Sequence, residues 1–113
     1  IMNWVKKNKR KISVYNDPKK AVKNADVIFS DKVVSLNDRA NKAKKINDFK
    51  NYRINLNLIK CAKKDVIFLH CLPRGNEVSE DVFLGNKSRV WQQALNRAHV
   101  QKSILLYCFE KLR

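Results

Sequence analysis

The sequence predicts an α/β fold, specifically a partial Rossmann-like parallel sheet with flanking helices and a long C-terminal helix. Three observations lead to this prediction. The letters Asp-Val-Ile-Phe occur at 26–29 and again at 65–68, and each copy follows a helical segment. Continuous apolar runs preceded by helices are typical of parallel strands that are covered on both faces. The third observation is a helical pattern of apolar residues from about 88 to 112.

Local signals predict the elements before the first of these strands. Residues 2–9 resemble the end of a helix, and 11–15 are expected to form a short strand. Asp17 can cap the free amides of a helix that begins at Pro18, because proline lacks an N–H and fits the first helical position. The buried stripe of this short helix is expected to be Ala21, Val22 and Ala25.

The rest of the chain is predicted in the same way. A lysine-rich helix is expected around 41–49, a further helix at 56–63 and a loop over 72–87. The closing helix should have one apolar face, with Trp91 as an anchor in the core. The residues of that face are Val90, Trp91, Ala94, Ala98, Ile104, Leu105, Cys108 and Leu112.

Length and composition indicate one folded domain. The chain has 113 residues, 44% of them apolar, with two glycines and two prolines, which argues against disorder. A single domain of this size is short for a two-substrate enzyme. Because the sequence starts at Ile1, we expect a fragment of a longer protein.

The chain is strongly basic, with 25 Lys and Arg against 10 Asp and Glu and a net charge of +15. Charge of this sign suggests nucleic acid or an anionic surface as a partner. The lysines are spread over 6–11, 19–23, 42–45 and 60–64, however, without the interleaved aromatic residues of a single-strand binding platform. Solvated lysines on helix exteriors explain the same composition, so we expect no nucleic-acid partner.

The cysteines predict free thiols in a reducing compartment. Cys61, Cys71 and Cys108 are odd in number and widely spaced, and no Cys-x-x-Cys pair or histidine cluster suggests a metal site. No apolar run reaches membrane-spanning length, and the lysine-rich start lacks the apolar stretch of a signal peptide. We therefore expect a cytoplasmic protein without a membrane, metal or cofactor requirement.

Polar and reactive residues follow both repeated strands. The residues are Asp31, Ser35, His70, Cys71 and the Leu72-Pro73 turn. Ligands of parallel α/β sheets bind at the carboxyl ends of the strands, where the connections vary over a rigid sheet. If the two strands are neighbours, a carboxylate, a hydroxyl and a thiol meet at one edge.

Each of these residues also has a simpler interpretation. Asp31 could cap a turn or hold an ammonium group, and Cys71 could be a small buried apolar residue or a ligand contact. His70 is more often a strand-end histidine bonded to a carbonyl than a catalytic base. Arg97 could be a surface residue, or its planar fork could bind a carbonyl or phosphate oxygen. We expect His99 to be structural.

Two longer stretches resemble a known family. "FLHCLPRGNEVSEDVF" followed by "SRVWQQALNRAHVQKSILL" closely resembles the carboxyl-terminal part of ornithine carbamoyltransferases. "NDPKKAVKNADVIFSD" is similar to the family segment that leads into the aspartate-containing ornithine loop. The similarity spans essentially the whole chain, and its most specific parts are the His-Cys-Leu-Pro motif and the later Asn-Arg pair.

The resemblance implies roles for particular residues. Asp31 would bind the α-ammonium of ornithine, and Ser35 and Leu36 would contact the amino acid, with Leu36 as an apolar wall. Cys71 would lie near the reactive δ-amine, and Leu72 would present its backbone carbonyl to the amine or carbamoyl group. Arg97 would bind the carbamoyl oxygen.

The ornithine loop departs from the family pattern. The family usually reads Asp-x-Trp-x-Ser-Met-Gly, whereas residues 31–37 read Asp-Lys-Val-Val-Ser-Leu-Asn. Leucine can replace methionine as an apolar residue of similar size, but Asn37 in place of glycine requires a left-handed asparagine or a changed loop. Leu95 stands where an acidic residue is common. These differences affect how ornithine is held more than the type of reaction.

The implied reaction is carbamoyl transfer from carbamoyl phosphate to ornithine without a cofactor, in a homotrimeric enzyme. The family's Ser-x-Arg-Thr phosphate loop and His-Pro-x-Gln segment do not occur here. Residues 1–113 would thus form the ornithine-binding domain, truncated at its N-terminal side and inactive alone. Related enzymes also imply a cis Leu72-Pro73 bond. The alternatives are a transcarbamylase for another amine and a basic nucleic-acid-binding module without catalysis.

Overall fold

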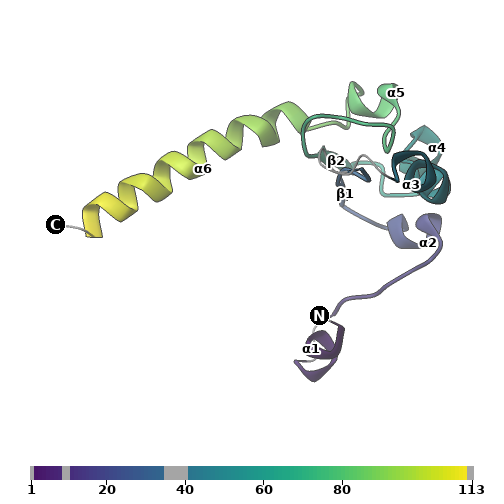
Figure 1. Ribbon diagram of the computed structural model, residues 1–113, viewed down its shortest axis with the longest axis horizontal. Coiled ribbons are helices and arrows are strands. Elements are labelled where there is room, and N and C mark those ends of the chain that lie inside the picture. The colour runs from purple at the N-terminus through teal and green to yellow at the C-terminus, as the bar shows by residue number, and fades with distance from the viewer. Residues whose placement is uncertain (1, 9–10, 35–40, 112–113) are drawn as a thin grey trace.

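The centre of the molecule is a two-stranded parallel sheet (Figure 1). A computed structural model describes residues 2–8, 11–34 and 41–111. Strand β1 (Val27–Ser30) pairs with β2 (Ile67–His70), with Val27 opposite Ile67 and Ser30 opposite His70. This pairing confirms the predicted parallel sheet, and it brings the carboxyl ends of both strands level with each other.

Helical elements precede, separate and follow the two strands along the chain, and the first helix and most of the last one lie away from the sheet (Figure 1). The elements are α1 (Met2–Lys7), α2 (Pro18–Val22), α3 (Lys42–Phe49), the 3-10 helix η1 (Lys50–Tyr52), α4 (Leu56–Ile59), α5 (Glu80–Phe83) and α6 (Val90–Lys111). Asp17 accepts a hydrogen bond from the Lys19 amide at 2.9 Å, with Pro18 at the first helical position, so the predicted cap of α2 is confirmed. Asn55 caps α4 by accepting from the Leu58 amide at 3.0 Å.

One apolar cluster joins the sheet to α2, α4, α5 and the first residue of α6. Phe68 is 0% exposed, and full burial of such a side chain contributes about 1.5–3 kcal/mol relative to an exposed position. The cluster consists of Val22, Ile28, Ile54, Leu58, Ile59, Val66, Phe68, Val78, Val82, Phe83 and Val90. The cluster covers one face of the sheet. On the other face Ile67 and Leu69 of β2 are only partly buried and Val27 and Phe29 of β1 are exposed, so the expectation that both faces are covered is wrong.

The outer edge of β2 is closed by the chain that enters α6. The Ile67 amide donates towards β1, to the Asp26 carbonyl at 3.0 Å. The Phe68 amide instead donates to the Lys87 carbonyl at 2.8 Å, and the Phe68 carbonyl accepts from the Arg89 amide at 2.9 Å. Because successive residues of a strand donate to opposite sides, β2 is fixed on both edges up to its carboxyl end.

Three sequence-based expectations about the elements are wrong. Residues 11–15 form no strand, and their apolar side chains Ile12, Val14 and Tyr15 are exposed, because no neighbouring strand pairs with them in the described structure. The helix expected at 56–63 ends at Ile59. Helix α5 lies inside the predicted 72–87 loop.

Trp91 is not the core anchor that the helical pattern predicted. Its side chain is 61% exposed and contacts the edge of the Phe83 ring, with centroids 5.8 Å apart. Helix α6 has 22 residues and is about 33 Å long, whereas a four-residue strand spans only about 13 Å. The helix therefore extends past the sheet, as Figure 1 shows, and Val90 is its buried residue.

Candidate functional site at the strand ends

The carboxyl ends of β1 and β2 bring a carboxylate and a thiol together. Asp31 follows β1, Cys71 follows β2, and the Cys71 Sγ donates a hydrogen bond to Asp31 Oδ1 at 2.9 Å. The two residues are 40 positions apart in the sequence, and the parallel register makes them neighbours. The expectation that the strand ends converge is confirmed for this pair, while Ser35 and Leu36 lie outside the described residues.

The two groups shift each other's ionisation. The hydrogen bond from the Cys71 thiol, together with a 2.7 Å bond from the Lys32 amide, lowers the pKa of Asp31 below its usual 3.8. Burial raises the pKa of the Cys71 thiol above 9.0, and the bond to Asp31 adds to this effect. At neutral pH the site therefore contains an exposed carboxylate and an uncharged thiol.

The chain turns sharply directly after Cys71. The Leu72-Pro73 peptide bond is cis, which confirms the prediction. Leu72 is 44% exposed, so it lies at the surface beside the pair of strand-end residues. On the far side of the turn, the Arg74 guanidinium lies 5.1 Å from the centre of the Phe83 ring, a cation–π contact that holds the outgoing chain against α5.

A buried contact between a histidine and a glutamate lies next to this turn. His70 Nε2 is 2.8 Å from Glu77 Oε1, with side chains 0% and 6% exposed, and His70 Nδ1 contacts the Cys71 carbonyl oxygen. The carbonyl contact agrees with the structural interpretation of His70. Glu77 was not predicted from the sequence. The signal that could have identified it is that a histidine at the end of a buried strand needs a polar partner.

A second unpredicted residue, Gln93, joins the site to α6. The His70 amide donates to Gln93 Oε1 at 3.1 Å, so the end of β2 is bonded to the first turn of the helix. Arg97 lies one turn further along α6 and is exposed. Among the described residues no hydrogen bond or ion pair joins Arg97 to Asp31 or Cys71. The structure thus brings Asp31, Cys71 and Leu72 together, and within the described ranges none of the three is bonded to Arg97.

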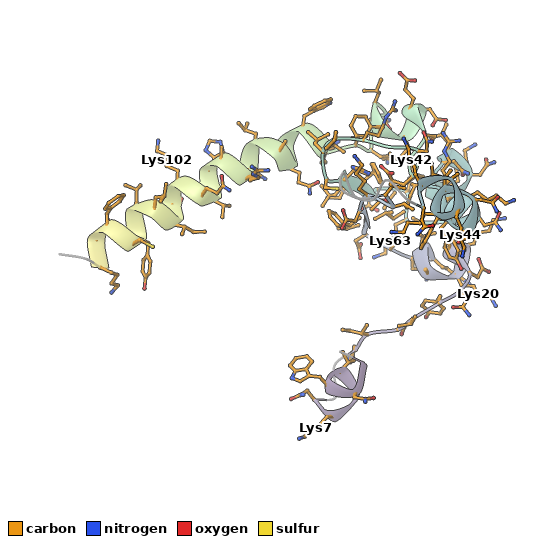
Figure 2. The ribbon with its side chains drawn as sticks, viewed as in Figure 1. Lys7, Lys20, Lys42, Lys44, Lys63 and Lys102 are labelled. Atoms are coloured by element: carbon orange, nitrogen blue, oxygen red, sulfur yellow. The ribbon has the colours of Figure 1, made fainter. Side chains whose placement is uncertain are left out.

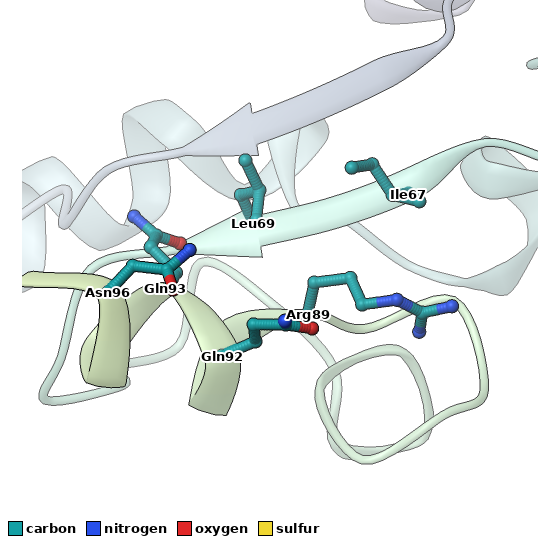
Figure 3. A pocket seen from close by; sticks show the side chains of 6 residues that line it. All are labelled: Ile67, Leu69, Arg89, Gln92, Gln93 and Asn96. Atoms are coloured by element: carbon teal, nitrogen blue, oxygen red, sulfur yellow. The ribbon is translucent and has the colours of Figure 1, made fainter. Parts of the chain in front are cut away.

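An open hollow of about 410 Å³ lies between β2 and the start of α6 (Figure 3). Figure 3 shows apolar side chains of the strand on one side and polar side chains of the helix on the other. Its lining residues are Ile67, Leu69, Arg89, Gln92, Gln93 and Asn96. The Arg89 guanidinium donates to the Asn86 and Ser88 carbonyls, both at 2.8 Å, so it helps to close the turn that precedes the helix.

Other classes of site have little support in the described part of the chain. No group of three or more His, Cys, Asp or Glu residues among the described residues could hold a metal ion. The lysines labelled in Figure 2 lie on α1, α2, α3 and α6 and after α4, and they form no single stripe. Within the described ranges, no helix is long and apolar enough to cross a membrane.

Comparison with protein families gives one extensive match. The family model described as "Aspartate/ornithine carbamoyltransferase, Asp/Orn binding domain" matches residues 1–108. The ornithine carbamoyltransferase of Nitratiruptor sp. is 42% identical over 112 residues, which are 97% of this chain and 36% of that protein. That of Staphylothermus marinus is 49% identical over 94 residues, 81% of this chain and 30% of the relative.

Solved structures of the same kind have the same fold. The anabolic ornithine carbamoyltransferase of Campylobacter jejuni superposes with a TM-score of 0.82 at 35% identity, covering 97% of this chain and 37% of that chain. The ornithine carbamoyltransferase from Pyrococcus furiosus gives a TM-score of 0.79 at 39% identity, covering 92% of this chain and 35% of that one. The present chain spans about a third of the length of these relatives.

Proposed function

This chain belongs to the aspartate/ornithine carbamoyltransferase family, and from that premise we propose that it forms the ornithine-binding domain of an ornithine carbamoyltransferase. The reaction forms a bond between the δ-nitrogen of ornithine and the carbamoyl carbon. The bond from that carbon to the phosphate oxygen breaks, and the products are citrulline and phosphate. In this proposal residues 1–113 bind the amino acid, and a separate domain of the intact enzyme binds carbamoyl phosphate.

The hydrogen bond between Cys71 Sγ and Asp31 Oδ1 is the observation on which the proposal depends most. Asp31 is an exposed carboxylate whose pKa is lowered, so it stays charged and can pair with the α-ammonium of ornithine. Cys71 lies in contact with it, at the position proposed for the reacting amine. A carboxylate and an uncharged thiol side by side suit a ligand with one positively charged amino group and one neutral amino group.

The chemistry requires the δ-amine in its neutral form, because an ammonium group has no lone pair to attack the carbon. Cys71 could act on this amine in two ways, by accepting a proton from it or by polarising it without proton transfer. Its raised thiol pKa favours the second role, since little thiolate is present at neutral pH to accept a proton. Cys71 would therefore orient the amine for attack, and the gain would come mainly from positioning.

The remaining site residues act on the other groups of the two substrates. The Leu72 backbone carbonyl would accept a hydrogen bond from the attacking amine or the carbamoyl NH2 group. Arg97 would offset negative charge on the carbamoyl oxygen, which suits its planar fork of donors. Ser35 and Leu36 would contact the amino-acid end of ornithine. In this proposal the exposed Arg97 reaches a carbamoyl group that lies between the strand ends and α6.

The proposal includes a cytoplasmic homotrimer with no cofactor and no nucleic-acid or membrane partner. All three cysteines are free thiols, which suits a reducing compartment. The dispersed lysines argue against the alternative of a basic nucleic-acid-binding module, because such a module needs a continuous basic surface. The other alternative, a transcarbamylase for a different amine, uses the same reaction with a different amino-acid contact.

Calorimetry and product analysis distinguish these functions. The intact enzyme, saturated with an unreactive carbamoyl-phosphate analogue, should bind ornithine, and with carbamoyl phosphate it should form citrulline. The isolated 113-residue chain should show negligible transfer, because it lacks the domain that positions the second substrate. Carbamoylation of another amine in preference to ornithine would reject the proposed substrate. Turnover by the isolated chain at the rate of the intact enzyme would reject the division between two domains.

A further inference from the structure

The buried charged residues of the described chain form one contact network behind the Cys71-Leu72-Pro73 turn. His70 and Glu77 are the two polar or charged residues that are buried among the described residues. Burial of charged groups is unfavourable unless they are paired and hydrogen-bonded. Such a pair directly beneath a proposed active-site turn therefore needs a physical reason, and its hydrogen bonds suggest one.

Glu77 connects the two ends of the turn. Its Oε1 atom is 2.8 Å from His70 Nε2 and also accepts a hydrogen bond from the Gly75 amide at 2.6 Å. His70 precedes the turn and Gly75 follows it, so one carboxylate oxygen spans the segment from 71 to 74. The backbone of Glu77 is itself fixed, because its carbonyl accepts from the Ile54 amide at 2.9 Å.

The histidine transmits this constraint to the peptide that links Cys71 and Leu72. Its Nδ1 atom contacts the Cys71 carbonyl oxygen, while its Nε2 atom faces Glu77. Both ring nitrogens thus face oxygen atoms. These two contacts hold the ring in place, and the Cys71 carbonyl with it.

Gly75 fits closely against the carboxylate. A Cβ atom at this position would lie 2.5 Å from Glu77 Oε2, closer than real contacts allow. Aromatic rings hold the histidine, since its centroid is 6.3 Å from that of Phe68 and 6.1 Å from that of Phe83. The network is therefore tightly packed, and small changes in Glu77 should move the turn.

From these contacts we propose that Glu77 is a positioning residue for carbamoyl transfer, acting through His70 and Gly75. It fixes the Cys71-Leu72 peptide so that the Cys71 thiol reaches Asp31 and the Leu72 carbonyl faces the amine. This inference rests on the proposed function and deepens it. Glu77 does not touch the substrates, and its effect is to hold the groups that do.

The main test is Glu77→Gln in the intact enzyme, with Glu80→Gln as the matched control. Glu80 is an exposed glutamate three residues away. Glu77→Gln should lower kcat by roughly 10- to 100-fold, the effect expected when a reacting group is displaced by about 1 Å. The KM for carbamoyl phosphate should stay within about twofold, because the change does not reach that substrate's domain. Glu80→Gln should match the parent.

A second readout does not depend on catalysis. Alkylation at each cysteine, followed by mass spectrometry, should show Cys71 reacting several times faster in Glu77→Gln, since the thiol is released from Asp31, while the exposed Cys108 reacts at an unchanged rate. If the parent transfers no carbamoyl group to ornithine, the proposed function fails, yet the alkylation rates still decide whether Glu77 holds the turn. Unchanged kcat and unchanged Cys71 alkylation would overturn the inference.

Two further variants test the inference if Glu77→Gln does not fold. Gly75→Ala moves the carboxylate aside without removing it, and it should produce the same pattern at smaller amplitude. Glu77→Asp retains the carboxyl group on a shorter side chain and should have a kcat between those of Glu77→Gln and the parent. If Gly75→Ala folds and leaves both kcat and Cys71 alkylation at parental values, Glu77 is merely structural and the inference is wrong.

Discussion

Replacement of Gln93 by leucine should loosen the carboxyl end of β2 without unfolding the sheet. The His70 amide donates to Gln93 Oε1 at 3.1 Å, and leucine has a similar size but no acceptor. A hydrogen bond contributes about 0.5–1.5 kcal/mol, and a stranded donor costs about 1–3 kcal/mol. Because Gln93 is half-buried and water can reach part of this site, we expect the lower part of that range, about 1–2 kcal/mol.

Hydrogen exchange at single amides measures this change directly. A change of 1.4 kcal/mol alters the equilibrium constant for local opening by a factor of ten. The His70 amide should therefore exchange about 5 to 30 times faster in Gln93→Leu. The amides of Ile67 and Phe68 donate to the Asp26 and Lys87 carbonyls and should keep their protection. Equal acceleration at all three amides, or none at His70, would refute the reasoning.

Two control variants separate the hydrogen bond from other effects of the substitution. Gln93→Glu keeps an acceptor oxygen and should leave exchange at His70 close to that of the parent. Gln92→Leu places the same apolar side chain on an exposed neighbouring position of α6 and should also have little effect. In the intact enzyme Gln93→Leu should lower kcat as well, since Arg97 lies one helical turn beyond the lost bond.

The remaining predictions concern the pair at the strand ends. Asp31→Asn should raise the KM for ornithine more than it lowers kcat, because a neutral amide cannot form an ion pair with an ammonium group. Cys71→Ala should impair both KM and kcat. Parental kinetics in both variants would mean that the two residues are structural. Cys71 should be alkylated more slowly than the exposed Cys108 at about pH 8, and its rate should still be rising with pH beyond 9.0, because burial and then the bond to Asp31 raise the pKa of its thiol. The stabilisation from the protonated thiol is complete below its unfolded pKa and is lost as the pH rises through the folded one. Equal alkylation rates for Cys71 and Cys108 would contradict this account.

The parallel sheet could be predicted because its signals are local and repeated. Each Asp-Val-Ile-Phe copy is short and apolar and follows a helix, and these features require only neighbouring residues to be recognised. The exact register could not be predicted in this way. Val27 pairs with Ile67 and not with the equivalent Val66 of the repeat, because pairing also depends on how the helices pack.

The errors at the two ends of the chain have a common physical cause. Apolar residues at 11–15 and along α6 follow periodic patterns. Such a pattern shows which face could be buried, but it does not show which element, if any, packs against that face. Ile12, Val14 and most of the Trp91 side chain are exposed, because Phe83 covers only part of Trp91 and no described element covers the rest. Extended chain becomes a strand only when a partner edge is available, and a helix of about 33 Å cannot be covered by a sheet of two short strands.

The residues at the strand ends could be predicted from their type and position, whereas the residues that contact them only through His70 could not. Asp31 and Cys71 follow strands, and strand ends of parallel sheets are the usual place for ligands. Glu77 and Gln93 lie in a loop and on a helix, where polar residues normally face solvent. Their roles depend on bonds to His70, which is distant in sequence by 7 and 23 positions.

The two carboxylates near the turn are suited to different tasks by their surroundings. Oε1 of Glu77 already contacts two partners, and the Glu77 side chain is 6% exposed, so a substrate has no access to this carboxyl group. Asp31 is exposed, and its partners are a weakly donating thiol and the adjacent amide of Lys32. An incoming ammonium group can replace the thiol at Asp31 because a charged donor binds a carboxylate more strongly than S–H does. Substitution of Asp31 should therefore act on ornithine binding, whereas substitution of Glu77 should act on the rate of transfer after both substrates are bound.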